Sequence, residues 1–215
     1  MNLTSLKIFT QNRLLEYLLN MHLHTNNRLF QDAVISAAQR FNIPEIFIEK
    51  DYWVTVARHA IFHSGVSDDA VFKGGTALSK CHKLIDRFSE DVDMVILNNK
   101  GESDNQLKNK LKAITNAVSK VMPEVEIEGV TNKKGMIRKT AHQYTKQRFI
   151  GTFGQVREQI IVEATWLGSP EPYISAEVSC YITDMMKASN QGHLIEQYKM
   201  PPFIVKVLSK ERTFC

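Results

Sequence analysis

Two aspartates, Asp91 and Asp93, are separated by a single residue at the start of a segment that is otherwise apolar as far as Leu97. Side chains two residues apart on a strand point to the same face, so we expect the two carboxylates to project together from a sheet. Carboxylates placed so close repel each other unless a cation lies between them, and Mg²⁺ is the hard cation that prefers oxygen ligands. The spacing therefore predicts a metal site at Asp91 and Asp93, because ions held in this way bridge phosphate oxygens.

A glycine pair, Gly74-Gly75, lies upstream of the two aspartates. Backbone without side chains approaches phosphates closely, and the start of the following helix offers free N–H donors. Thr76 and Ser79 add hydroxyl groups, and Lys80 adds a positive charge, although solvation at the surface explains such a lysine equally well. A glycine pair alone is more often an ordinary turn, and a D-x-D pair is common on surface loops. The order of strand, glycine pair, helix and acidic strand start is more specific, and it indicates phosphate binding.

The elements that position these residues follow from the periodicity of the apolar residues. A strand over 70–72 and a strand over 91–97 are expected to enclose a helix over 76–86, with Thr76 as its N-cap. Further helices are predicted over 3–23, 27–41, 44–63 and 104–122, and further strands over 125–128, 137–148 and 159–167. Irregular chain is expected around four later prolines: Pro170, Pro172, Pro201 and Pro202.

A basic segment over 131–148 contains no acidic residue, whereas the rest of the chain is slightly acidic. The strand pattern places this segment on a hairpin, and a local basic patch indicates phosphate or nucleic acid as a ligand. We therefore predict an RNA-binding surface at Lys133, Lys134, Arg138 and Lys139. On charge alone, a solvated hairpin without a ligand is an equally good interpretation.

The composition fits one globular domain, since 43% of the 215 residues are hydrophobic and 23% are charged. The formal net charge is +4. Three widely spaced cysteines favour neither a disulfide framework nor a zinc site. No apolar run approaches the roughly 20 residues of a membrane helix, and the N-terminus lacks the order of a signal peptide. We therefore expect a cytoplasmic protein without a membrane partner.

Three motifs carry a resemblance to a known family. The first is FKGGTALSK followed by LIDRFSEDVDM, the second is IEKDYWV over 48–54, and the third is VLSKERTF over 207–214. The chain resembles the AbiEii/MenA-type nucleotidyltransferase toxins over residues 21–215, and residues 1–20 are then an N-terminal extension. Members of this family continue beyond the third motif with a helical part, which the sequence over 21–215 does not contain.

The resemblance implies an α+β fold of the nucleotidyltransferase superfamily, in which helices flank a mixed sheet and the N-terminal helices pack on it. It implies that a nucleoside triphosphate (NTP) binds at the glycine turn and that the two aspartates hold two Mg²⁺ ions. A third carboxylate is expected from a neighbouring strand, and Glu163 is the best candidate; the alternative is a structural, ion-paired glutamate. The nucleotide-binding residues would be Gly74, Gly75, Thr76, Ser79 and Lys80, and the catalytic residues Asp91, Asp93 and Glu163.

The expected function is metal-dependent transfer of a nucleotidyl group from an NTP to an acceptor. The resemblance implies the toxin of a toxin–antitoxin system active in phage abortive infection, with tRNA as the acceptor and an antitoxin as a partner. The alternative is a catalytically incomplete remnant that binds a nucleotide or RNA and does not transfer. A protein hydroxyl group or a small molecule also remains open as the acceptor.

Overall fold

The computed structural model describes residues 21–82, 84, 90–147, 156–168 and 170–213, with backbone only for residues 76, 212 and 213. The predicted helix over 3–23 and the extension over 1–20 thus lie almost wholly outside the described residues. Leu23–Thr25, at the end of that range, forms a short 3₁₀ helix, η1.

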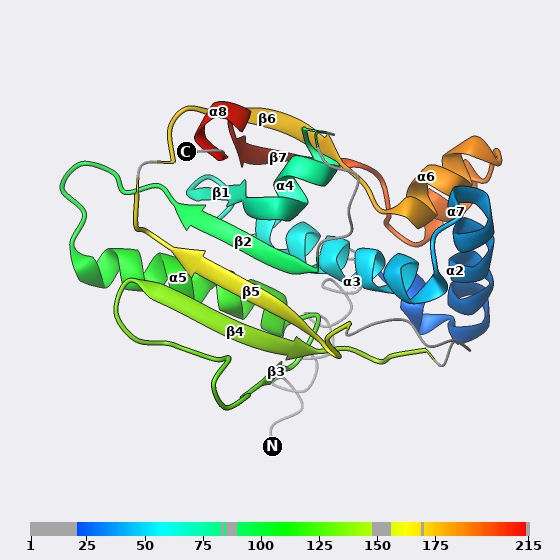
Figure 1. Cartoon of the computed structure of the whole chain (residues 1–215), viewed down its shortest axis with the longest axis horizontal. Coiled ribbons are helices and arrows are strands. Elements are labelled where there is room, and N and C mark those ends of the chain that lie inside the picture. The colour runs from blue at the N-terminus through cyan, green and yellow to red at the C-terminus, as the bar shows by residue number, and fades with distance from the viewer. Residues whose placement is uncertain (1–20, 83, 85–89, 148–155, 169, 214–215) are drawn as a thin grey trace, which may run out of the picture.

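A seven-stranded mixed sheet is the centre of the described fold (Figure 1), and its strand order is β3-β4-β5-β2-β1-β7-β6. β2 runs parallel to β5 and β1 runs parallel to β7, whereas the other neighbouring strands are antiparallel. The strands are β1 (Ala70–Lys73), β2 (Asp91–Ile96), β3 (Glu124–Val125), β4 (Ile137–Gln143), β5 (Gln159–Thr165), β6 (Tyr173–Val178) and β7 (Phe203–Leu208).

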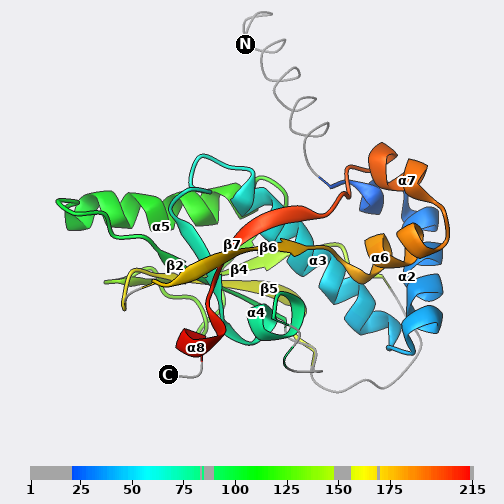
Figure 2. The same cartoon turned by 90° about the horizontal axis from the view of Figure 1, so that it is seen from above.

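Helices lie on both sides of this sheet, which confirms the expected α+β class. α5 packs on one side and α4 with α8 lies on the other (Figure 2). α3 packs on β2, β5 and β7, while α2 packs on α3 and α6 at one end of the molecule. The helices are α2 (Asn27–Phe41), α3 (Glu45–Phe62), α4 (Gly74–Lys80), α5 (Asp104–Ser119), α6 (Tyr181–Ala188), α7 (Gly192–Gln197) and α8 (Lys210–Thr213). Among the described residues, no helix is long and apolar enough to span a bilayer.

Strand alternation decides which face of β2 is buried. Val92, Met94 and Ile96 are fully buried and belong to the core that α3 and α5 cover. Asp91 and Asp93 alternate with them and therefore project from the opposite face. The predicted placement of both carboxylates on one face is thus what the structure shows.

Several predicted elements differ in extent. The helix expected over 76–86 begins at Gly74, so its N-cap is Lys73 and not Thr76, and Lys73 makes no side-chain capping hydrogen bond. The strand expected over 125–128 is confined to Glu124–Val125, because the chain turns at Ile127, whose carbonyl accepts from the backbone N–H groups of residues 130 and 131.

The four later prolines stand in irregular chain, as expected, but this chain is short and leads into strands that the sequence did not predict. Pro170 and Pro172 precede β6, and Pro201 and Pro202 precede β7. A proline has no N–H to donate to a ladder, but it is tolerated before a strand begins. These prolines therefore mark the boundaries of two strands.

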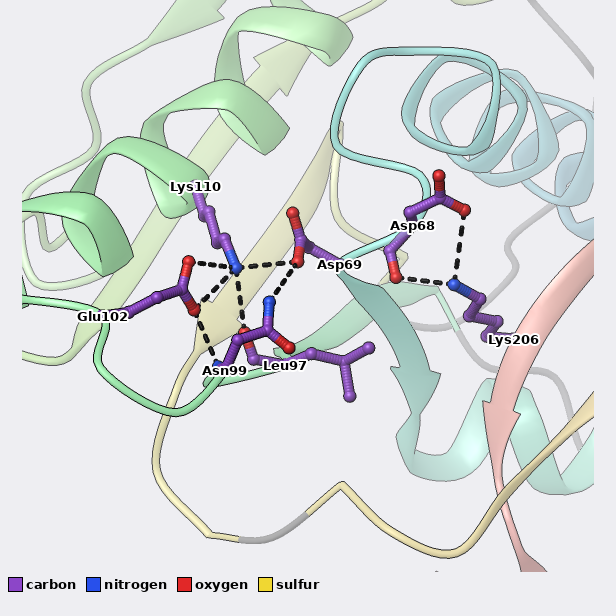
Figure 3. A network of polar contacts seen from close by, with 7 residues as sticks. All are labelled: Asp68, Asp69, Leu97, Asn99, Glu102, Lys110 and Lys206. Carbon is purple, nitrogen blue, oxygen red and sulfur yellow. Dashed lines mark hydrogen bonds and ion pairs between the residues drawn. The ribbon is translucent and has the colours of Figure 1, made fainter.

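The end of the β1–β2 pair that lies away from the two aspartates is tied to α5 by Lys110 (Figure 3). The Lys110 ammonium group donates to Asp69 at 2.7 Å and to the Leu97 carbonyl at 3.2 Å, and it pairs with Glu102 at 2.6 Å. Lys206 of β7 contacts the neighbouring Asp68, whose side chain is 99% exposed. The two lysines thus differ in the number of partners and in their burial.

We expect Lys110→Met to lower the free energy of unfolding by about 2 kcal/mol, because a charged group with three partners is removed from a partly buried network. Lys206→Met should cost less than about 1 kcal/mol, since an exposed ion pair contributes little. Urea denaturation of both variants checks the difference. Equal losses would show that the Lys110 network does not secure this end of the sheet.

Candidate active site

Four charged residues form a row across the open face of the sheet. Lys73 of β1 is opposite Asp93 of β2, Asp93 is beside Glu163 of β5, and Glu163 is opposite Lys139 of β4. Side chains of paired residues on adjacent strands share a face and lie close together. The register therefore places Asp93 and Glu163 side by side, with one lysine at each end of the row.

The carboxylate of Asp93 lies against the backbone of Gly74, the first residue of α4. A Cβ atom at Gly74 would overlap the Asp93 carboxylate oxygen and would lie 3.0 Å from its Cγ. Gly74 also has a φ of +81°, which L residues with side chains rarely adopt. The glycine pair and the aspartate pair, far apart in the sequence, thus belong to one site.

The charge of Asp93 is poorly compensated where it lies. The pKa of Asp93 is raised to about 6, first by burial and then by the nearby Asp91 and Glu163 carboxylates, while Lys73 and Lys139 act in the opposite direction. A neighbouring cation would remove this repulsion. The all-oxygen donor set of Asp91, Asp93 and Glu163 has the chemistry that Mg²⁺ prefers.

Two of the three carboxylates are engaged by basic side chains. Arg157 donates to Asp91 at 3.0 Å, and Lys139 pairs with Glu163 at 3.1 Å. In the described part of the chain, no group of three His, Cys, Asp or Glu side chains is arranged to hold a metal ion. Metal binding at this face therefore requires Arg157 and Lys139 to give up contacts with the carboxylates.

Lys50 of α3 fastens the chain at the start of β5. Its ammonium group donates to the carbonyls of Arg157 and Gln159 at 2.5 and 2.7 Å, and it lies 3.5 Å from Glu90. Its side chain has no exposed surface, and burial lowers its pKa to about 8, with Glu90 acting in the opposite direction. Lys50 thereby fixes the backbone on both sides of residue 158, next to Asp91.

Asp51, the next residue of α3, holds a different segment. It pairs with Lys80 of α4 at 2.7 Å and accepts a hydrogen bond from the backbone N–H of Tyr181 at 2.8 Å. The Lys80 ammonium group also lies 3.6 Å from the centroid of the Tyr181 ring. Lys50 and Asp51 together connect α3 to β5, α4 and α6.

The predicted nucleotide-binding residues divide into two groups. The backbone of Gly74 lies against Asp93, and Gly75 follows it in the first turn of α4. Ser79 and Lys80, at the other end of α4, line a pocket of about 390 Å³ with residues of β6 and α6. The side chain of Thr76 lies outside the described residues, so its predicted hydroxyl contact stays a prediction.

The predicted RNA-binding residues do not all lie on one side of the sheet. Lys139 faces the carboxylates, whereas the adjacent Arg138 points to the other side of the sheet and donates to Thr115 of α5 at 2.8 Å. Lys133 pairs with Glu124 at 2.5 Å, and Lys134 is exposed. Strand alternation between residues 138 and 139 causes the division.

Two residues of the site were missed or left unexplained by the sequence reasoning. Arg157 precedes β5 by two residues, and only the register of β5 on β2 brings it to Asp91. Lys50 stands in a recognised motif, but its contacts are with backbone carbonyls that no side-chain pattern reveals. The sequence did offer one indication of the role of Lys50, which is a charged residue within the apolar helix α3. Such a group is rarely buried without a partner.

Comparison with known proteins identifies a family and similar solved structures. The family model described as "Nucleotidyl transferase AbiEii toxin, Type IV TA system" matches residues 56–215. Among solved structures, the chain is similar to MenT4, a nucleotidyltransferase toxin of Mycobacterium tuberculosis H37Rv, with 15% identity and a TM-score of 0.42. The match covers 84% of this chain and 51% of that chain, so this chain spans about half the length of that toxin. No curated protein sequence matches.

Gly74→Ala tests the contact with Asp93. We expect this variant to lose more than about 2 kcal/mol of stability, because strain at positive φ adds to an overlap with the carboxylate. Gly129→Ala is the matched control, since Gly129 has a φ of +73° but no atom near its missing Cβ. Thermal unfolding of both variants gives the comparison. If the two variants lose the same stability, the Gly74–Asp93 contact contributes nothing.

Asp93→Asn should stabilise the metal-free protein at neutral pH. The folded pKa of Asp93, about 6, lies above its ordinary value of 3.8, so this carboxyl group destabilises the fold progressively as the pH rises from 3.8 to 6. We expect a gain of about 1–2 kcal/mol at pH 7 that vanishes toward pH 4, smaller than the full shift because the side chain is partly exposed. Urea unfolding across this pH range measures it.

Asp91→Asn is the control for this pH dependence. The Asp91 side chain is 40% exposed and pairs with Arg157, so its charge needs no relief. Because the Asp91 charge also raises the pKa of Asp93, Asp91→Asn removes part of this repulsion but also the partner of Arg157, so its gain should be smaller than that of Asp93→Asn. If the difference in unfolding free energy between wild type and Asp93→Asn does not change with pH, the described environment of Asp93 is contradicted.

Proposed function

Since the chain belongs to the AbiEii family of nucleotidyl transferase toxins of type IV toxin–antitoxin systems, we propose that it transfers a nucleotidyl group from an NTP to an acceptor. The observation that carries this proposal is the packing of the Asp93 carboxylate against Gly74. It brings the backbone of a glycine turn to an acidic pair on a strand, as a site for a metal-bound triphosphate requires.

In the proposed reaction, the acceptor oxygen forms a bond to the α-phosphorus of the NTP and loses its proton, and the bond to the bridging oxygen breaks to release pyrophosphate. Asp91 and Asp93 would hold Mg²⁺, with Glu163 as the third carboxylate. When bound, Mg²⁺ neutralises charge on the phosphate oxygens. The protein's own contribution is positioning, since little covalent chemistry falls to its side chains.

The residues near the carboxylates supply the remaining parts of the proposed site. Gly74 and Gly75 are proposed to present the backbone N–H groups of α4 to phosphate oxygens, and Thr76 is proposed to add a hydroxyl group. Gly74 also makes room for the Asp93 carboxylate. Lys73, Lys139 and Arg157 carry positive charge around a substrate with several negative charges. Ser79 and Lys80 are proposed to contact the nucleotide from the far end of α4.

The acceptor that we propose is tRNA, and the biological role is that of a cytoplasmic toxin with a cognate antitoxin, acting in phage abortive infection. Family membership supports the role of a toxin. Basic side chains on β4 and the preceding turn support a nucleic-acid acceptor, because phosphate backbones bind to such groups.

Labelling of RNA tests the proposal. The protein is incubated with each radiolabelled NTP in turn, with Mg²⁺ and total bacterial tRNA, and we expect labelled RNA from at least one NTP. Asp91→Asn/Asp93→Asn should lower the label at least about 100-fold, because the charge that holds the metal is lost. Asp32→Asn/Asp68→Asn, which removes two exposed carboxylates elsewhere, is the matched control and should label normally.

The outcomes separate the candidate functions. Binding of an NTP without any labelled product would favour a nucleotide-binding protein that does not transfer. Label on protein and not on RNA would retain the nucleotidyl transfer and change the acceptor. Label that persists in Asp91→Asn/Asp93→Asn would remove these aspartates from the mechanism.

A further inference from the structure

A basic pocket lies between α5, the turn that precedes β4, and β4 itself. Its volume is about 420 Å³. Five of its lining residues are cationic and none is acidic: Lys108 and Lys112 of α5, Lys133 and Lys134 of the turn, and Arg138 of β4. We call this feature the α5–β4 pocket. Cations from three separate segments therefore converge on a pocket whose lining contains no acidic residue.

Arg138 is held in place at the α5–β4 pocket. Its Nε donates to Thr115 of α5 at 2.8 Å, which leaves the other guanidinium N–H groups for a ligand. Lys108 and Lys112 are one helical turn apart and so share one side of α5. Both are exposed, and within the described residues neither they nor Lys134 take part in an ion pair. Lys133 is the exception, since it pairs with Glu124.

The pocket lies on the side of the sheet opposite the carboxylates. Arg138 points toward α5, and its neighbour Lys139 points toward Glu163. β3 pairs only with Ala141 and His142, and an isolated bridge from Asn132 to Lys139 borders the part of β4 that carries Arg138 and Lys139, which therefore lies near the edge of the sheet. A long polyanion that passes over this edge can therefore contact the pocket and still reach the carboxylate site, whereas one small anion cannot.

We propose that the α5–β4 pocket binds the phosphodiester backbone of the acceptor nucleic acid, away from the site of nucleotidyl transfer. This inference rests on the proposed function, because it assigns the pocket to the acceptor of that reaction. Several exposed cations around a pocket whose lining contains no acidic residue suit a series of phosphates. Such binding releases counterions and depends on salt, not on base sequence. Lys108 and Lys112 belong to this surface, and Lys139 does not.

Binding of a fluorescein-labelled single-stranded RNA, measured by anisotropy without NTP or divalent metal, tests the proposal. We expect Lys108→Ala/Lys112→Ala to weaken binding at least about tenfold and to lower the slope of log K against log salt by about 2, one for each lost phosphate contact. Alanine favours the helix, so α5 should remain folded, which circular dichroism checks. Lys187→Ala/Lys199→Ala removes two exposed lysines elsewhere and should bind as wild type does.

Two results would overturn the proposal. One is RNA binding by Lys108→Ala/Lys112→Ala with the affinity and salt slope of wild type. The other is displacement of the RNA by inorganic tripolyphosphate at an affinity equal to that of the RNA, which would make the pocket a site for free polyphosphate. Failure of the proposed function is seen in the labelling experiment instead. In that case the protein gives no labelled product but still binds RNA through the pocket.

Discussion

The buried pair of neighbouring charges on α3, Lys50 and Asp51, is the constraint on which the rest of the structure depends. Both side chains are almost entirely removed from water, at 0% and 3% exposure. A buried charge without a partner costs several kcal/mol, so each residue requires a partner of its own. Adjacent helical residues lie about 100° apart around the axis, and these two therefore reach different segments. Lys50 donates to carbonyls just before and at the start of β5, whereas Asp51 binds to residues of α4 and α6.

These partners are the segments that form the candidate site. α4 brings Gly74 to Asp93, and the start of β5 brings Arg157 to Asp91. One helix thus positions both flanks of the carboxylates from the far side of the sheet, without contributing a side chain to the row itself. The sheet register supplies the remaining order, because it aligns Lys73, Asp93, Glu163 and Lys139 across four strands.

Much of the fold and of the candidate site can be predicted from the local sequence pattern. The rest depends on contacts between residues that are far apart in the sequence. Alternation alone places Asp91 and Asp93 on one face, and the α2 boundaries agree with the predicted range. The same alternation, applied to residues 138 and 139, would have divided the basic segment between two faces. The register of β5 on β2 depends on pairing between strands that are distant in the sequence, and the position of Arg157 depends on this register. The four later prolines alone did not indicate that strands begin directly after them. The role of Lys50 depends on backbone carbonyls more than 100 residues away.

The contact between Gly74 and Asp93 restricts how this sequence can diverge. Any side chain at residue 74 needs the space that the Asp93 carboxylate occupies, and a smaller residue at 93 would restore that space only by removing the acid. No single substitution at 74 is therefore neutral while the aspartate is retained. If Asp93 is replaced during evolution, the steric reason for glycine at residue 74 is lost as well. Substitutions at residues 74 and 93 should therefore be correlated. After such a loss, only the positive φ at residue 74 would still favour glycine.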